Sequence, residues 1–402
     1  MRKTRILLAG GGTGGHVLPL VAVARAIRKV ASDAKVYFIG PEEFPLDELR
    51  EEGVVVKKII AAGKIRRYFS PLYVWELVKL PLAAIESFVK VLLINPDVVL
   101  GKGSYGSVLP ILCARLLGKQ VILHESDVMP GLANRFLSKF INHIALAFEE
   151  TRKYFPGKNI YMTGNPIRLK YLDLTKEEAR EFLQPLFHSI SVRSYTNAIS
   201  GEGGSRKAIF VSGGSQGAQR INEIVLKTIK DLIQKYTVIW STGQNNYQAI
   251  KNELKNHNVN TSHTIVEDLL TMSAESDGRL RLFPLLAEKE LAAAYILCDI
   301  VIGRAGSGTI FEAAAFGKPA ILIPIESAGN HQLYNAQSYA GTGAAKILRE
   351  SELSAPALLK ILNDLMANDQ LLIQMSQSAG KFAKIDAAEQ LAQILLTNQS
   401  RI

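Results

Sequence analysis

The chain has 402 residues, which indicates more than one domain because a single hydrophobic core stops growing at roughly 250 to 300 residues. Apolar residues make up 48% and charged residues 21%, which excludes an intrinsically disordered chain. The 47 basic and 37 acidic side chains leave a net charge of +10 and favour an anionic partner: nucleic acid, an anionic membrane surface or a phosphorylated substrate. No long lysine and arginine run is present, so we expect no nucleic-acid partner.

Two cysteines, Cys113 and Cys298, lie far apart in apolar segments, and neither has a nearby partner for a disulfide or a metal site. We therefore expect reduced, buried thiols in a cytoplasmic protein. The apolar run that begins at residue 5 is too short for the core of a signal peptide and leads directly into glycines. It predicts a first strand.

That strand opens a glycine-rich loop, "RILLAGGGTGGHVLPL" at residues 5–20. Gly10, Gly12 and Gly15 match the dinucleotide fingerprint, in which glycines let the backbone approach a pyrophosphate at a helix N-terminus. The fingerprint also expects an acidic ribose anchor roughly 20 residues further on. The candidate, Glu42, is poorly placed after the strand "KVYFIG". The loop therefore predicts diphosphate binding and disfavours a nicotinamide-dependent dehydrogenase.

Short apolar runs alternate with helical patterns along the chain, which predicts parallel sheets with crossover helices. The first half contains the expected strands "RILLAG", "KVYFIG", "VVVKKII", "DVVLGKG", "QVILHES", "HIALAF" and "IYMTGNP". A stretch rich in serine and glycine at 184–207 predicts an insert or linker. The pattern restarts at "AIFVSGGSQGAQ" and continues through "TVIWSTG", "LRLFP", "DIVIGRAG", "PAILIP" and "AAKIL".

These patterns predict an α/β protein with two doubly wound, Rossmann-like domains that face a cleft, the arrangement called GT-B. The expected divisions are an N-terminal domain at 1–165, a linker with the insert at 166–206, a C-terminal domain at 207–375 and a C-terminal helix at 376–402. We expect this helix to pack back on the N-terminal domain. Ligands of such sheets bind at the carboxyl ends of the strands, so the loops there are the candidate site.

One segment is suited to a membrane surface. Residues 64–75, "KIRRYFSPLYVW", place two arginines beside aromatic residues, and an apolar segment follows at 77–94. Three charged residues and a proline interrupt the apolar segment, so it does not suit a bilayer span. Basic and aromatic side chains together favour a helix bound to anionic lipid. The alternative is an ordinary crossover helix packed on the sheet.

The loops that follow the predicted strands carry the most specific signal. They include "GGGTGGH", "GKGSYGS", "HESDVMPG", "GNPIR", "VSGGSQGA", "GRAGSGTIFEAAAFGKPAILIP" and "NHQLYNA". In this order they closely resemble the MurG enzymes of peptidoglycan synthesis, over nearly the whole chain apart from 184–207. The resemblance implies transfer of N-acetylglucosamine from UDP-GlcNAc to lipid I, the undecaprenyl-diphospho-muramoylpentapeptide, to form lipid II. It also implies a peripheral protein at the cytoplasmic face of the cell membrane.

The resemblance assigns substrate contacts residue by residue. The implied substrate-binding residues are Thr13, Gly14, Gly15, Tyr105, Asp127, Arg168, Ser215, Arg304, Ser307, Gly308, Thr309, Glu312 and Gln332. The first loop lines the donor and acceptor cleft, with His16 beside the acceptor diphosphate. Arg168 is implied to contact the nucleotide sugar and Ser215 its diphosphate. Glu312 is implied to hold the ribose hydroxyls and Gln332 to contact the sugar hydroxyls, as a carboxylate and an amide can.

The implied reaction inverts the anomeric carbon in one displacement, so it needs a base, stabilisation of departing UDP and exclusion of water. His16, Asp127 and Glu125 are the candidate bases, and His16 has the most suitable ordinary pKa. No DxD triplet follows a strand, so we expect no metal and no cofactor. The family's usual "HEQN" is "HESD" here, so Asp127 must be protonated, face a cation or make a different contact. The "LLAEKE" loop also departs from the family, which leaves Pro284 and Leu285 only approximate uracil contacts.

Three other functions fit a GT-B chain. The first is another glycosyltransferase, acting on diacylglycerol or on a natural product. The second is a UDP-GlcNAc 2-epimerase, which shares the fold. The third is a binding protein without catalysis, and the presence of Arg168, Ser215, Glu312 and Gln332 disfavours it.

Overall fold

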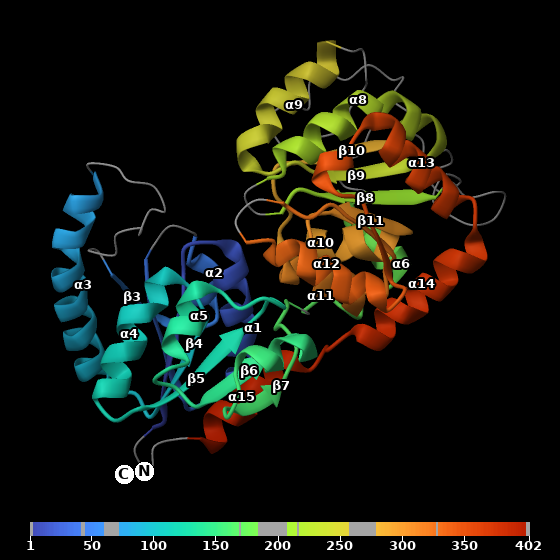
Figure 1. Ribbon diagram of the computed structural model, residues 1–402. Helices are drawn as coiled ribbons and strands as arrows, with labels where there is room; N and C mark the ends of the chain where they lie inside the picture. Colours follow the sequence, from blue (N-terminus) through green and yellow to red (C-terminus); the bar gives the residue numbers. More distant parts are fainter. Residues whose placement is uncertain are drawn as a thin grey trace. The chain divides into compact units, whose positions relative to one another are not determined.

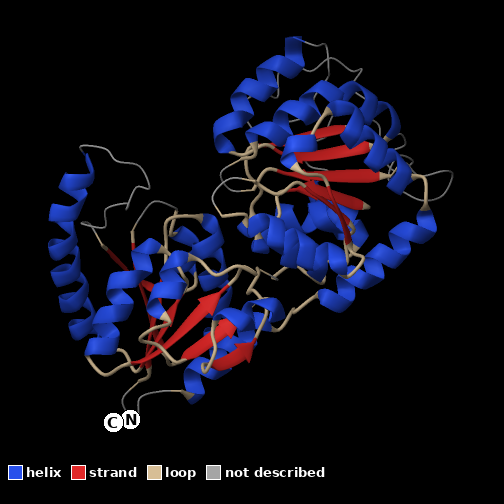
Figure 2. Cartoon of the chain, in the orientation of Figure 1, coloured by secondary structure: helices blue, strands red, loops and turns tan. Residues whose placement is uncertain are grey.

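The computed structural model describes residues 3–41, 45–59, 72–168, 170–183, 207–214, 217–256, 279–326 and 329–398, with only the backbone described at 72–79. The chain divides into two units, Met1–Arg168 with Lys384–Ile402 and Leu169–Ala383. Each unit is a parallel β-sheet with helices on both faces (Figure 1). Figure 2 shows the strands of each sheet in red between blue helices.

The first unit has a seven-stranded sheet in the order β3-β2-β1-β4-β5-β6-β7. Its strands are β1 (Arg5–Ala9), β2 (Lys35–Gly40), β3 (Val55–Lys58), β4 (Val98–Gly101), β5 (Gln120–Glu125), β6 (His143–Leu146) and β7 (Asn159–Met162). Its helices are α1 (Gly14–Val30), α2 (Asp47–Glu51), α3 (Leu72–Ile94), α4 (Tyr105–Leu116), α5 (Leu132–Leu137), the short 3-10 helix η1 (Glu149–Tyr154) and α15 (Ala387–Thr397).

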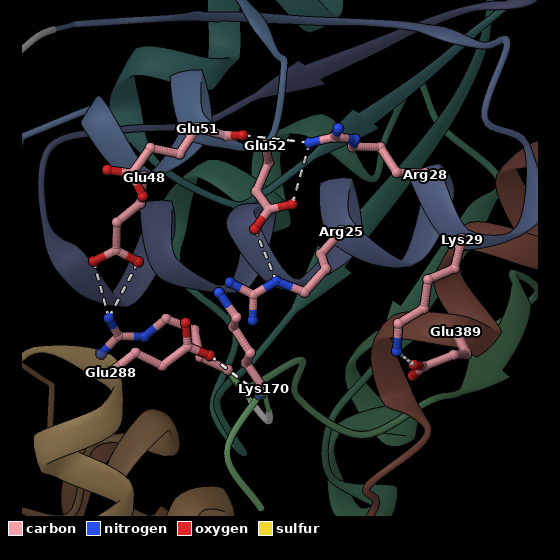
Figure 3. Close-up of polar contacts among 10 residues, drawn as sticks. Arg25, Arg28, Lys29, Glu48, Glu51, Glu52, Lys170, Glu288 and Glu389 are labelled. Carbon is pink, nitrogen blue, oxygen red and sulfur yellow. Dashed lines mark hydrogen bonds and ion pairs between the residues drawn. The ribbon is translucent and has the colours of Figure 1, made fainter. Parts of the chain in front are cut away.

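Alternation along β1 explains the two layers of helices on this sheet, because successive side chains of a strand point to opposite faces. Ile6 and Leu8 belong to a buried cluster with α1 and α15. Leu7 and Ala9 belong to a second cluster with α3, α4 and α5. Lys29 of α1 also pairs with Glu389 of α15 at 3.6 Å, so the last helix of the chain packs in the same unit as the first (Figure 3).

The second unit has a six-stranded sheet in the order β10-β9-β8-β11-β12-β13. Its strands are β8 (Ala208–Ser212), β9 (Thr237–Ser241), β10 (Leu280–Phe283), β11 (Ile300–Gly303), β12 (Ala320–Leu322) and β13 (Ala345–Ile347). Its helices are α6 (Lys176–Leu183), α8 (Gln219–Lys235), α9 (Gln244–Asn256), α10 (Glu288–Leu297), α11 (Ser307–Ala315), α12 (His331–Gly341), η3 (Glu350–Glu352), α13 (Ala355–Met366) and α14 (Asp369–Phe382).

The predicted fold class is confirmed, because both sheets are parallel and every predicted strand is present. The strand order reverses between β1 and β4 and between β8 and β11, which are the positions where ligands of doubly wound sheets bind. Among the residues that the structure describes, no helix has the length and hydropathy needed to span a bilayer.

The division of the chain differs in two places from the predicted one. Residues Lys176–Leu183, which the sequence places in the linker at 166–206, form α6. This helix packs against α10, and Phe182 lies 4.2 Å from the ammonium of Lys289, so it is a structured part of the second unit. The second unit also extends through α14, and only the segment from Lys384 onward belongs to the first. Residues 187–204 lie outside the described residues.

Candidate active-site loops

The glycine-rich loop after β1 has a backbone that only glycine adopts without strain. Gly11 and Gly12 have φ of +124° and +94°. A Cβ on Gly12 would lie 3.0 Å from the Tyr105 ring, and one on Gly10 would lie 2.8 Å from Leu20. The sequence therefore places glycines where the loop approaches α4 and where it passes over α1. Helix α1 begins directly after this loop, and the first N–H groups of a helix have no partner within the helix.

The start of α1 positions the candidate base. Thr13 precedes the helix in extended conformation, and its carbonyl accepts the backbone N–H of His16 at 3.0 Å. The Thr13 hydroxyl oxygen also lies 3.0 Å from His16 Nδ1, which fixes the imidazole at the first turn. Burial and the positive charge of Lys102 lower the pKa of His16 to about 4. His16 is therefore neutral near pH 7, as a proton acceptor must be.

A buried polar cluster lies at the carboxyl ends of β4, β5 and β7, and the sequence analysis did not identify it. Lys102 is 2% exposed, and its Nζ lies 2.7 Å from His124 Nδ1 and 2.9 Å from Asn165 Oδ1. His124 Nε2 lies 2.9 Å from the carbonyl oxygen of Gly164. The sequence does hold a signal for this cluster, because Lys102 stands between two glycines directly after an apolar strand. A lysine that is buried there needs a polar partner, since lysine is almost never fully buried without one.

Glu125 is held as a rigid acceptor below the "HESD" loop. Its carboxylate accepts the backbone N–H groups of Asp127 and Gly131, both at 3.0 Å, and the Asn134 amide at 2.9 Å. Burial and the neighbouring Asp127 raise the pKa of Glu125. These three donors occupy both carboxylate oxygens, so Glu125 orders the loop and is poorly suited to be the base. Burial lowers the pKa of Lys102 to about 7, and the neighbouring carboxyl groups of Glu125 and Asp127 oppose that shift.

Arg168 ends the first unit in an ion pair. Its Nη1 donates to both carboxylate oxygens of Glu48 of α2, at 2.9 and 3.1 Å, and its side chain is 7% exposed. A network on the same side of α1 joins Arg25 to Glu52 at 2.8 Å and thereby fixes α2. Arg168 therefore lies in an ion pair within the first unit, and its guanidinium is far more buried than that of an ordinary surface pair.

In the second unit, the loop after β8 is only partly described. Ser215 lies outside the described residues, as does Glu42 in the first unit. Gly214 and Gly217, which flank Ser215, have φ of +67° and +77°. A Cβ on Gly217 would lie 2.4 Å from the Asn246 amide, so the loop packs closely against the start of α9.

The loop after β11 is anchored by its arginine. Arg304 donates to the carbonyl of Ile323 at 3.2 Å and to Glu350 at 2.5 Å. The Asn335 amide donates to the carbonyl of Ala305 at 3.3 Å, which ties the loop to α12. Helix α11 then begins at Ser307, followed by Gly308 and Thr309, all partly exposed. Backbone N–H groups at such a helix start are suited to a phosphate. Arg304 therefore shapes this loop through bonds inside the unit.

Two expected donor-binding side chains are oriented by neighbours. Glu312 of α11 accepts a hydrogen bond from the hydroxyl of Tyr295 at 3.1 Å. Tyr295 is fully buried and stacks on Phe316 with ring centroids 5.2 Å apart. Gln332 of α12 accepts the backbone N–H of Ile325 through Oε1 at 3.2 Å, so its amide nitrogen is directed elsewhere. Tyr295 was not predicted, because its contact with Glu312 depends on how α10 and α11 pack.

Two doubly wound units with glycine-rich loops at their reversal points have the arrangement of GT-B proteins. Models of the glycosyltransferase family 28 N-terminal and C-terminal domains match residues 6–146 and 208–391. The chain belongs to glycosyltransferase family 28.

Relatives match the chain over nearly its whole length. It is 33% identical over 390 residues to the UDP-N-acetylglucosamine--N-acetylmuramyl-(pentapeptide) pyrophosphoryl-undecaprenol N-acetylglucosamine transferase of Alkaliphilus metalliredigens, covering 96% of this chain and 97% of that protein. The protein of the same name from Caldanaerobacter subterraneus is 33% identical over 401 residues, covering 98% and 99%. The resemblance to this family is confirmed.

Solved structures agree on the fold. Acinetobacter baumannii MurG has a TM-score of 0.68 at 24% identity, covering 98% of this chain and 99% of that one. The UDP-GlcNAc 2-epimerase of Neisseria meningitidis, bound to UDP-GlcNAc, has a TM-score of 0.65 at 13% identity, covering 98% and 100%. Because transferases and epimerases share this fold, the fold alone does not choose between them.

Proposed function

We propose that this protein transfers N-acetylglucosamine from UDP-GlcNAc to the muramoyl 4-hydroxyl of lipid I, with inversion, and forms lipid II. The observation that carries the proposal is the full-length match to transferases named for this reaction, in both domains of the family. Lipid II is the precursor of peptidoglycan, so loss of the protein is expected to disturb cell-wall biogenesis, cell shape and division.

The donor is assigned to the second unit. Its pyrophosphate would accept N–H groups of the loops after β8 and β11, around Ser215 and at Ser307, Gly308 and Thr309. Negative charge grows on UDP as the glycosidic bond breaks, and a helix N-terminus stabilises that charge. Glu312 would accept hydrogen bonds from both ribose hydroxyls while the Tyr295 hydroxyl orients its carboxylate. Gln332 would contact the sugar. The chain's own groups then supply the leaving-group stabilisation that this reaction requires.

The acceptor is assigned to the first unit. Its diphosphate would lie against the loop of Thr13, Gly14 and Gly15, near Tyr105. His16 would accept the proton of the attacking hydroxyl, since its imidazole is neutral at pH 7. Arg168, held by its ion pair with Glu48, would contact the nucleotide sugar. Asp127 would contact the substrate at the same loops, and His16 would act as the base.

The anionic membrane surface is assigned to α3, α4 and α5. Along α3 an exposed apolar stripe includes Ile85 and Leu92, which are 61% and 53% exposed. The corner between α4 and α5 exposes Leu116, Leu132, Phe136 and Phe140 beside the exposed basic residues Arg115, Arg135 and Lys139. Exposed apolar side chains beside basic ones are suited to the headgroup region of an anionic membrane. A peripheral location at the cytoplasmic face of the cell membrane, where lipid I would be presented, is therefore part of the proposal.

The described residues include only part of the predicted membrane segment. Arg66, Arg67 and the aromatic residues at 68–69 lie outside the described residues, and the side chain of Trp75 is not described. The test therefore uses Ile85→Ser with Phe136→Ser, and exposed Ile373→Ser in the second unit as the control. The double variant should lose co-sedimentation with phosphatidylglycerol vesicles but keep activity on a short-chain soluble acceptor. Unchanged sedimentation of the double variant would remove this face from the membrane contact.

One experiment, which compares three acceptor conditions, separates the proposed activity from its alternatives. UDP-GlcNAc labelled in the sugar is incubated with lipid I, with diacylglycerol and with no acceptor. Label should move to lipid I only. Transfer to diacylglycerol indicates a glycolipid transferase, UDP-ManNAc formed without acceptor indicates an epimerase, and binding without turnover indicates a non-catalytic protein.

A further inference from the structure

The segment between β12 and α12 determines how the Gln332 amide is oriented. Gln332 Oε1 accepts the backbone N–H of Ile325 at 3.2 Å. A backbone N–H can only donate, so the amide oxygen must face Ile325 and the amide nitrogen must face away from it. The hydrogen-bond donors that Gln332 offers to a sugar therefore depend on where the backbone of Ile325 lies.

The chain that leads to Ile325 is fixed by the sheet and by one arginine. The N–H of Ile323 donates to the carbonyl of Gly303 at 2.8 Å, and the carbonyl of Ile323 accepts from Arg304 Nη1 at 3.2 Å. Pro324 follows, and its ring restricts φ to about −65°. The backbone on the N-terminal side of Ile325 thus has little freedom.

An ion pair holds the chain on the C-terminal side of Ile325. Arg349 Nε donates to Glu326 Oε1 at 2.7 Å, and the hydroxyl of Ser351 donates to the same oxygen at 3.1 Å. Both donors come from the segment after β13, which is the neighbour of β12 in the sheet. The carboxylate next to Ile325 is therefore tied to the adjacent strand connection.

The chain turns sharply between this ion pair and Gln332. Gly329 and Asn330 have φ of +87° and +56°, and Asn330 directly precedes α12, in which Gln332 is the second residue. A positive φ is uncommon for a residue with a side chain. This turn lies outside the sheet, so its position depends on side-chain contacts such as the Glu326–Arg349 pair.

We propose that Glu326 and Arg349 are positioning residues for the donor sugar: their ion pair holds Ile325 where its N–H orients Gln332, whose amide nitrogen then donates to a hydroxyl oxygen of the sugar. This role rests on the proposed contact between Gln332 and the sugar. The pair should therefore contribute to the affinity that the sugar adds to the nucleotide, and not to the affinity for UDP itself.

The test measures the Kd of UDP-GlcNAc and of UDP by titration calorimetry with the full-length protein and no acceptor. Arg349→Met breaks the pair, and Gln332→Ala removes the proposed sugar contact. Arg152→Met is the control, because it breaks an ion pair of the first unit in which the arginine is equally exposed, at 51%. Arg349→Met should raise the Kd of UDP-GlcNAc about three- to fivefold, the upper range for an exposed ion pair, and leave the Kd of UDP unchanged.

A double variant shows whether the pair acts through Gln332. Arg349→Met added to Gln332→Ala should raise the Kd of UDP-GlcNAc no further, because the contact that the pair orients is already lost. The same rise in both backgrounds overturns the proposal. Glu326→Gln removes the charge from the other side of the pair, should act in the same direction, and replaces Arg349→Met in the comparison if that variant fails to fold.

The remaining outcomes are equally decisive. An unchanged Kd of UDP-GlcNAc in Arg349→Met overturns the proposal, and so does an equal loss of affinity for UDP, which would show a general disturbance of the second unit. An unchanged Kd of UDP-GlcNAc in Gln332→Ala removes the glutamine from the sugar site and overturns the proposal with it. The expected pattern, in protein that transfers no sugar to lipid I, supports the positioning role and removes the proposed function.

Discussion

Replacing Tyr295 with phenylalanine should weaken donor binding without disturbing the core. The substitution removes only the hydroxyl that donates to Glu312 at 3.1 Å and keeps the ring that stacks on Phe316. A hydrogen bond to a charged group contributes roughly 1.5 to 3 kcal/mol. The observed distance lies at the long end for a hydroxyl donor, so we take about 1.5 kcal/mol. The KM for UDP-GlcNAc should therefore rise about tenfold.

The assay is steady-state transfer with the donor varied at saturating acceptor. Tyr339→Phe is the matched control, because Tyr339 is fully buried and its hydroxyl has no hydrogen-bond partner among the described residues. Glu312→Gln should itself raise the donor KM, at a cost of roughly 1 to 3 kcal/mol. The double variant should be less than additive, since Tyr295 acts through Glu312. An additive double variant would refute this coupling, and an unchanged donor KM in Glu312→Gln would remove Glu312 from the ribose site.

Three further predictions concern other parts of the chain. Glu48→Gln should raise the donor KM several-fold, because Arg168 loses the carboxylate that holds its Nη1; the expected cost is only about 1 kcal/mol, since Glu48 is partly exposed. An unchanged donor KM would place Arg168 outside the donor site. Deleting most of residues 187–204 should leave the activity within a few-fold and the melting temperature nearly unchanged, because loop length costs little entropy; loss of folding contradicts a linker. Burial lowers the pKa of Lys102 from 10.5 to about 7 in the folded protein. Between pH 7 and 10.5 the unfolded chain therefore binds more protons than the folded one, so the free energy of unfolding should rise with pH in this range. Urea unfolding should show this rise in the wild type and less of it in Lys102→Met, and equal slopes would contradict the buried charge.

The sequence was sufficient for the fold because each strand is a short apolar run followed by a turn. The strand "RILLA" is an example: its alternate residues pack on opposite layers of helices, and both layers form as the pattern predicts. The two glycine-rich loops were likewise visible, since glycine is required where Gly11 and Gly12 adopt positive φ.

The partners of the site residues were not predictable in the same way. Glu48 and Arg168 are 120 positions apart, and only the packing of α2 brings them together. Tyr295 reaches Glu312 because two consecutive helices of the second unit pack on one face of its sheet. Lys102 left a signal, a charge between glycines at a strand end, but its bonds to His124 and Asn165 depend on the neighbouring strands β5 and β7. Local sequence patterns specify helices and strands, whereas the contacts between these side chains depend on how the helices and strands pack.

The most direct measurement of the central claim is the structure of the product formed from UDP-GlcNAc and lipid I. NMR of the purified product should show N-acetylglucosamine joined to the muramoyl 4-hydroxyl in β configuration, with one UDP released for each sugar transferred. An α linkage would contradict the single displacement with His16 as base. Sugar recovered only as UDP-ManNAc, or no product at all with lipid I, would contradict the transferase function itself.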